Sequence, residues 1–128
     1  MSYKGKVLLQ WLLILPIAFQ FLYLGFLKIN GGMEHAFNSW GYAQSFMYFI
    51  GLIEVLSAIG LFFAKSRNVA CLAQVAMMLG AIYTHWMFFE YFEILINIGI
   101  IGLTSIIMWL EREKLMVPEE ARESSVPY

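Results

Sequence analysis

Four long apolar stretches limit what this 128-residue chain can fold into more than any other feature of its sequence. A helix needs about 20 mostly apolar residues to cross the hydrocarbon core of a bilayer. The strands of a membrane barrel would instead alternate apolar and polar residues, and these stretches do not. The sequence therefore predicts an all-α integral membrane protein, folded as a four-helix bundle. The expected spans cover residues 7–29, 45–64, 68–89 and 92–110.

The composition agrees with a membrane protein and argues against several soluble classes. Apolar residues make up 61% of the chain and charged residues 13%, against about 45–50% and 25% in soluble domains. A net charge of −1 gives no basic field, so no nucleic-acid partner is expected. Cys71 is the only cysteine and there are two histidines, so neither a thiol pair nor a metal or haem site is expected.

The basic residues predict the orientation of the chain. If it crosses the membrane four times, seven of the eight Lys and Arg residues fall on one side, which the positive-inside rule makes cytoplasmic. Both termini are then cytoplasmic, in a multi-pass protein of the inner (plasma) membrane. Residues 1–110 form the transmembrane domain, and residues 111–128 form a polar cytoplasmic tail. The seven residues are Lys4, Lys6, Lys65, Arg67, Arg112, Lys114 and Arg122.

Ionisable residues inside spans are costly and usually face a bundle interior or a cavity. Glu54 lies near the middle of the second span, among small residues that allow another helix to approach. Lys28, near the outer end of the first span, either reaches the interface or turns inward to pair with Glu54. Gln20 lies at about the level of Glu54, within reach of its carboxyl group. The alternative role of Glu54 is structural, tying helices together.

The third and fourth spans add three more polar residues near the same level. His85 has a pKa open to tuning near neutral pH, although a lone histidine is more often a packing residue. Glu93 and Asn97 lie on one stripe of the fourth span. The alternative to a binding role is that Glu93 is solvated and that Asn97 bridges helices. The candidate ligand-binding residues, all in the outer half of the bundle, are therefore Gln20, Lys28, Glu54, His85, Glu93 and Asn97.

Aromatic residues are dense around this level, including Trp40, Tyr42, Phe46 and Tyr83. A mostly apolar cavity with a few convergent polar groups is the usual form of a small-molecule site. An aromatic, partly polar guest such as a quinone suits such a cavity. The alternative is an aromatic belt over a well-packed bundle.

Three segments resemble the DoxX and DoxX-like membrane protein family. They are FLYLGFLKI (Phe21 to Ile29), GLIEVLSAIGLFF (Gly51 to Phe63) and MMLGAIYTHW (Met77 to Trp86). The resemblance extends over most of the chain and implies a four-helix protein of the bacterial inner membrane. Founding members of the family are membrane subunits of a thiosulfate:quinone oxidoreductase. On this resemblance Lys28, Glu54 and His85 match polar positions that recur in the family.

Two functions of different classes remain open. The first is a quinone-interacting or redox-associated membrane subunit, at most one subunit of a quinone-linked oxidoreductase, with a quinone as its only expected cofactor. The second is a non-enzymatic helper or chaperone-like subunit that packs against a partner membrane protein through the small residues of its second and third spans. The expected partners are the lipid bilayer, a membrane or redox protein, and a second copy of the chain.

Overall fold

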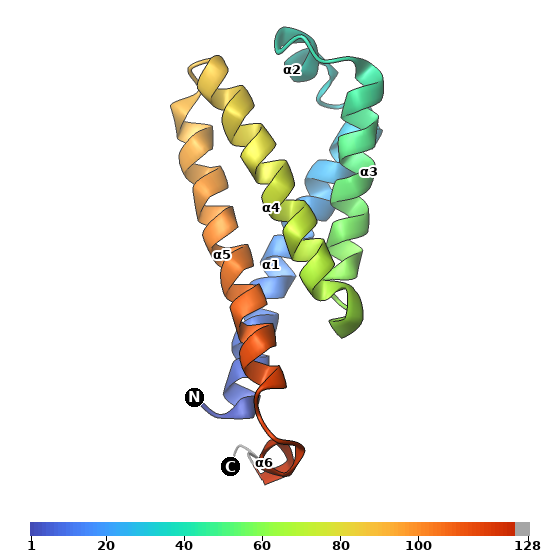
Figure 1. Cartoon of the computed structure of the whole chain (residues 1–128). Helices are drawn as coiled ribbons and strands as arrows, with labels where there is room; N and C mark the ends of the chain where they lie inside the picture. The colour runs from blue at the N-terminus through green and yellow to red at the C-terminus, as the bar shows by residue number, and fades with distance from the viewer. Residues whose placement is uncertain (125–128) are drawn as a thin grey trace.

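The computed structural model describes residues 1–124, and this part of the chain is all-helical, as predicted (Figure 1). Three helices are long and apolar enough to cross a membrane, namely α1, α4 and α5. The apolar helix α3 is shorter, at 17 residues. The elements are α1 (Tyr3–Ile29), α2 (Glu34–Ser39), α3 (Gln44–Gly60), α4 (Ala64–Met87), α5 (Tyr91–Leu115) and α6 (Glu119–Ser124).

The four longer helices pack in a ring. Helix α1 contacts α3 and α5, and helix α4 contacts the same two helices. Figure 1 shows α3 and α4 close together near their connecting turn and far apart at the opposite end, where α2 lies. We call this opposite end, which also holds the α4–α5 turn, the α2 end. The end that holds the start of α1, the end of α5 and α6 is the terminal end.

Glycine allows α1 and α3 to touch through their backbones. A Cβ atom added at Gly51 would lie 2.8 Å from the carbonyl oxygen of Gly25, and one at Gly25 would lie 2.8 Å from that of Gly51. The same Cβ at Gly51 would lie 2.8 Å from the Cβ of Lys28. This close approach brings Lys28 on α1 toward Glu54, one turn beyond Gly51 on α3.

The α3–α4 turn is as short as the hydropathy pattern predicts but lies four residues earlier in the chain. Helix α3 ends at Gly60 and α4 begins at Ala64, four residues earlier in each case than the expected spans. Side chains bond to the last carbonyl oxygens of α3, which have no partner within the helix. Ser66 Oγ donates to Gly60 O at 2.8 Å, and Arg67 Nε donates to Leu61 O at 2.8 Å.

A buried polar network joins α1, α4 and α5 near the terminal end. Gln10, Arg67 and Glu111 are all buried. Arg67 Nη1 donates to Glu111 Oε2 at 2.9 Å and to Gln10 Oε1 at 3.2 Å, while Gln10 Nε2 donates to Glu111 Oε2 at 2.8 Å. Lys114 Nζ also donates to Gln10 Oε1, at 2.6 Å. The sequence analysis placed Arg67 in a turn and Lys114 in the tail, and did not anticipate this network.

The Arg67–Glu111 bond also sets the register of the antiparallel α4–α5 pair. Gln74 lies seven residues after Arg67 on α4, and Thr104 lies seven residues before Glu111 on α5. Both are therefore displaced equally toward the α4–α5 turn and lie at about the same level. Both are fully buried, and in the part of the chain that the structure describes Gln74 Oε1 and Thr104 Oγ1 have no hydrogen-bond partner. A further seven residues along α5 is Asn97, so α5 presents polar side chains to the interior at regular intervals.

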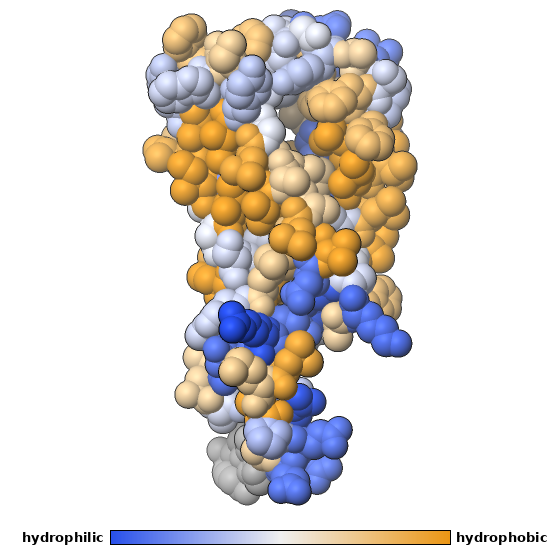
Figure 2. Space-filling view, viewed as in Figure 1, coloured by the Kyte–Doolittle hydropathy of each residue, from blue (hydrophilic) through white to orange (hydrophobic). Residues whose placement is uncertain are grey.

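The outer surface is covered by apolar side chains. Phe19 and Phe92 are each 72% exposed, and Val69 on α4 is 69% exposed. Figure 2 shows a broad apolar surface toward the α2 end and hydrophilic residues gathered toward the terminal end. Soluble monomers rarely expose so much contiguous apolar surface, so these helix faces are suited to contact lipid.

Candidate functional site

A cavity of about 590 Å³ lies where α3 and α4 diverge toward the α2 end. Its volume is within the range of about 300–1,000 Å³ that is typical of small-molecule sites. Ile50 and Glu54 line it from α3, and Gly80 and Ala81 line it from α4. Figure 2 shows a hollow in this part of the surface, between α4 and the α2–α3 segment. The cavity therefore opens sideways between two helices whose outer faces are apolar.

Small residues of α4 make room for the cavity. Ala76, Gly80 and Ala81 line it, and a Cβ atom added at Gly80 would have no neighbour within 4 Å. The opposite walls carry larger aromatic side chains, including Phe37 and Phe46. The cavity is thus lined both by small residues of α4 and by aromatic side chains of α2 and α3.

A buried ion pair forms one polar wall of the cavity. Lys28 Nζ lies 2.8 Å from Glu54 Oε1, and the two residues are only 6% and 3% exposed. The backbone contact between α1 and α3 brings the two side chains together. Only one carboxylate oxygen is used, because Glu54 Oε2 is buried and has no hydrogen-bond partner among the described residues.

Asn97 supplies a second unsatisfied polar group from α5. Its Nδ2 is buried and has no hydrogen-bond partner within residues 1–124, and the residue lines the same cavity. A buried polar atom without a partner costs about 1–3 kcal/mol. Within the described residues, the side chains that line the cavity thus include an unpaired acceptor, Glu54 Oε2, and an unpaired donor, Asn97 Nδ2.

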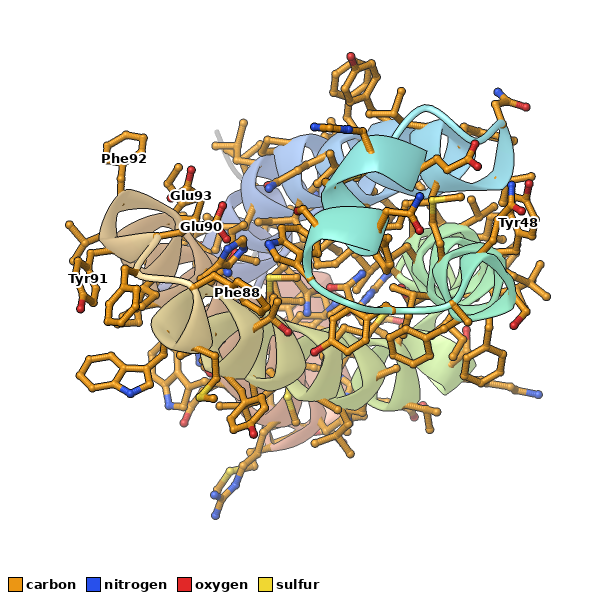
Figure 3. All side chains as sticks on the ribbon, turned by 90° about the horizontal axis from the view of Figure 1, so that it is seen from above. Tyr48, Phe88, Glu90, Tyr91, Phe92 and Glu93 are labelled. Carbon is orange, nitrogen blue, oxygen red and sulfur yellow. The ribbon has the colours of Figure 1, made fainter. Side chains whose placement is uncertain are left out.

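The segment around α2 closes the cavity at the α2 end and is held there by two sets of polar contacts. Trp40 Nε1 donates to Glu90 Oε1 at 2.9 Å, and His85 Nδ1 lies 3.1 Å from the same oxygen. The Tyr42 hydroxyl lies 2.6 Å from Thr84 Oγ1, which itself donates to a backbone carbonyl. Seen from above in Figure 3, Glu90 turns toward the interior, whereas the neighbouring Tyr91 and Phe92 point away.

A glycine lies at each end of this segment. Gly31 and Gly41 have φ of 79° and 80°, in the left-handed region that glycine adopts without strain. Between them, Met33, Phe37 and Trp40 line the cavity. The α2 segment, residues 31–41, therefore covers the cavity. It has a glycine at each end and is hydrogen-bonded to the α4–α5 turn.

Five of the six candidate residues line this cavity, and one does not. The structure brings together Lys28, Glu54, His85, Glu93 and Asn97. Gln20 is half-buried on α1 and is not among the lining residues. Lys28 turns inward to Glu54, which is the second of the two alternatives that its position in the sequence allows.

The sequence did not predict the hydrogen bonds that hold the α2 segment in place. Trp40 and Tyr42 were expected only as part of a general aromatic level, with no partner predicted for either. Their roles depend on the path of residues 30–43, which hydropathy does not describe. The signal available was local, since a tryptophan and a tyrosine flank a glycine in the sequence Trp40, Gly41, Tyr42.

The apolar helices, the lipid-suited surface and the cavity between the helices define an integral membrane protein with an internal small-molecule-sized site. The chain belongs to the DoxX-like family, whose sequence model matches residues 12–107. This match confirms the resemblance seen in the three segments. No curated protein and no solved structure matches the chain.

Proposed function

We propose that the cavity binds the ring of a quinone and that the chain is a quinone-interacting, redox-associated subunit of the inner membrane. The observation that carries the proposal is the pair of unsatisfied groups, Glu54 Oε2 and Asn97 Nδ2, in a cavity that is otherwise apolar and aromatic. The sideways opening between α3 and α4 suits a ligand that is dissolved in the bilayer.

The donors in the cavity fit the oxygen atoms of a quinone. A carbonyl oxygen accepts hydrogen bonds, and Asn97 Nδ2 is free to donate one. Lys28 carries three N–H donors, of which Glu54 takes one. The apolar walls near Gly80 and Phe46 receive the ring, and its hydrophobic tail leaves between α3 and α4.

The proposal includes four membrane crossings with both termini in the cytoplasm. The three long helices alone would leave the start of α1 and the end of α5 on opposite sides, yet both lie at one end of the molecule (Figure 1). A crossing by α3 resolves this, because an even number of spans returns the chain to its starting side. At 1.5 Å per residue, α3 is about 26 Å long, and a short span is accommodated by local thinning of the bilayer.

The helper function is the second candidate. Its expected contact face included Gly51 and Gly80, but Gly51 is packed against α1 and Gly80 lines the cavity. A different face favours it instead. Gly99 and Gly102 on α5 are exposed and have open space around them, and small residues on a helix face allow a partner helix to approach closely.

Purification in mild detergent followed by mass spectrometry of the extracted small molecules tests the quinone proposal. We expect a stoichiometric quinone with the unaltered protein, and its loss from Gly80→Leu, which fills the cavity. The matched control is Gly99→Leu, an equally open glycine on the outer surface, which should retain the quinone. Retention by Gly80→Leu would contradict the proposal. A protein partner that is lost in Gly99→Leu, with no small molecule bound, would favour the helper.

A further inference from the structure

We infer that the cavity prefers a ligand that donates a hydroxyl hydrogen to Glu54, and hence an aromatic diol, the reduced quinol, over the oxidised quinone. The inference rests on the proposed function and names which form of the ligand the site selects. It follows from the inventory of unused donors and acceptors in the cavity.

Glu54 is the discriminating group. Its contact with the Lys28 ammonium at 2.8 Å makes it one half of an ion pair, and a carboxylate only accepts hydrogen bonds. The free oxygen, Glu54 Oε2, is buried and has no donor within the described chain. A ligand must therefore bring its own donor to this oxygen.

A hydroxyl group brings a donor, whereas a quinone carbonyl does not. The carbonyl oxygen has lone pairs only, so at Glu54 Oε2 it would place one acceptor against another. The hydroxyl oxygen donates its hydrogen to Glu54 and still accepts from a donor such as Asn97 Nδ2. The oxidised quinone thus satisfies only Asn97 Nδ2, whereas the reduced quinol satisfies both Asn97 Nδ2 and Glu54 Oε2.

The expected preference is considerable, because hydrogen bonds to charged groups are strong. A bond of this kind contributes enough to change affinity by about 10- to 100-fold. A site built around a hydrogen-bonded hydroxyl also rejects analogues that lack it, since the buried protein group is then left unpaired.

Equilibrium binding to the purified full-length protein in detergent tests the inference, measured by isothermal titration calorimetry under anaerobic conditions. The probes are decylubiquinone, decylubiquinol and the dimethyl ether of decylubiquinol, which keeps the reduced ring but has no hydroxyl donors. We expect decylubiquinol to bind at least about 10-fold more tightly than decylubiquinone. The dimethyl ether should lose this advantage.

Two variants separate the roles of the polar groups. Asn97→Leu removes a donor that both forms use, so it should weaken both and leave the preference for decylubiquinol. Glu54→Gln replaces the acceptor-only carboxylate with an amide that also donates, so the preference should disappear. If Glu54→Gln alone does not fold, Lys28→Met/Glu54→Gln removes both charges together, and the same loss of preference is expected.

The outcomes distinguish the inference from the proposed function. If no probe binds, the proposed function fails. If decylubiquinone binds as tightly as decylubiquinol, or more tightly, the quinone site stands and the inference is wrong, as when water satisfies Glu54 Oε2. A preference that persists when both charges are removed also overturns the inference.

Discussion

At the scale of single residues, the Lys28–Glu54 pair is the most consequential interaction. Both side chains are buried, and Lys28 also closes the cavity toward α1. Buried ion pairs contribute little net stability compared with apolar replacements, yet losing one partner is costly because the other charge is then uncompensated. The pair thus constrains the cavity more than it stabilises the fold.

Removing one partner should therefore be worse than removing both. Lys28→Met leaves the Glu54 carboxylate unpaired, and we expect a loss of about 3–5 kcal/mol in the free energy of unfolding. The double variant Lys28→Met/Glu54→Gln should recover most of this loss. Chemical denaturation in detergent measures both values. A double variant that loses as much stability as Lys28→Met, or more, would contradict this account of the pair.

At the scale of helices, glycines have opposite roles on α3 and α4. Gly51 allows backbone contact between α1 and α3, whereas Gly80 leaves space open in the cavity. The same residue type therefore serves packing in one helix and a binding volume in another. Sequence alone does not separate these roles, because both glycines occur in apolar spans.

A pair of alanine substitutions separates them. Gly51→Ala places a methyl group 2.8 Å from the Gly25 carbonyl oxygen, so α1 and α3 must move apart, at an expected cost of about 1–3 kcal/mol. Gly80→Ala meets no neighbour and should be neutral or stabilising by about 0.5–1 kcal/mol, because alanine favours a helix. Thermal unfolding in detergent ranks them, and a Gly51→Ala protein as stable as Gly80→Ala would contradict the packing.

The network near the terminal end gives a second prediction for helix packing. Arg67→Met removes bonds to Leu61 O, Gln10 and Glu111 from a buried site, so we expect a loss of at least about 1.5–3 kcal/mol. The control is Lys65→Met, two residues away and exposed, which should change stability little. Similar unfolding midpoints for the two variants would contradict a structural role for Arg67.

The sequence predicted features that follow from composition and helical spacing, and missed those that depend on loop paths. The helical class, the inward-facing level and the Glu54–Lys28 alternative come from hydropathy and helical rise. The contacts of Trp40 with Glu90 depend on how residues 30–43 fold back. The Arg67–Glu111 bond depends on α4 and α5 continuing past the apolar stretches, where hydropathy no longer marks the helix.

At the scale of the whole molecule, the topology is the next feature to test. Four crossings place Lys4 in the cytoplasm and His35, on α2, outside. In a Cys71→Ala background, a membrane-impermeant maleimide should label His35→Cys in intact cells, and Lys4→Cys only after permeabilisation. Both replaced residues are exposed, so access depends on the membrane. Labelling of Lys4→Cys in intact cells would contradict cytoplasmic termini.

The central claim is that the cavity between α3 and α4 holds a quinone ring. The most direct measurement is photolabelling of the protein in membranes with an azido-quinone, followed by mass spectrometry of the labelled peptides. The account predicts label on cavity-lining positions such as Ile50 and Ala81, displaced by excess unlabelled quinone. Label confined to lipid-facing positions such as Phe19 and Val69, and undiminished by competition, would contradict it.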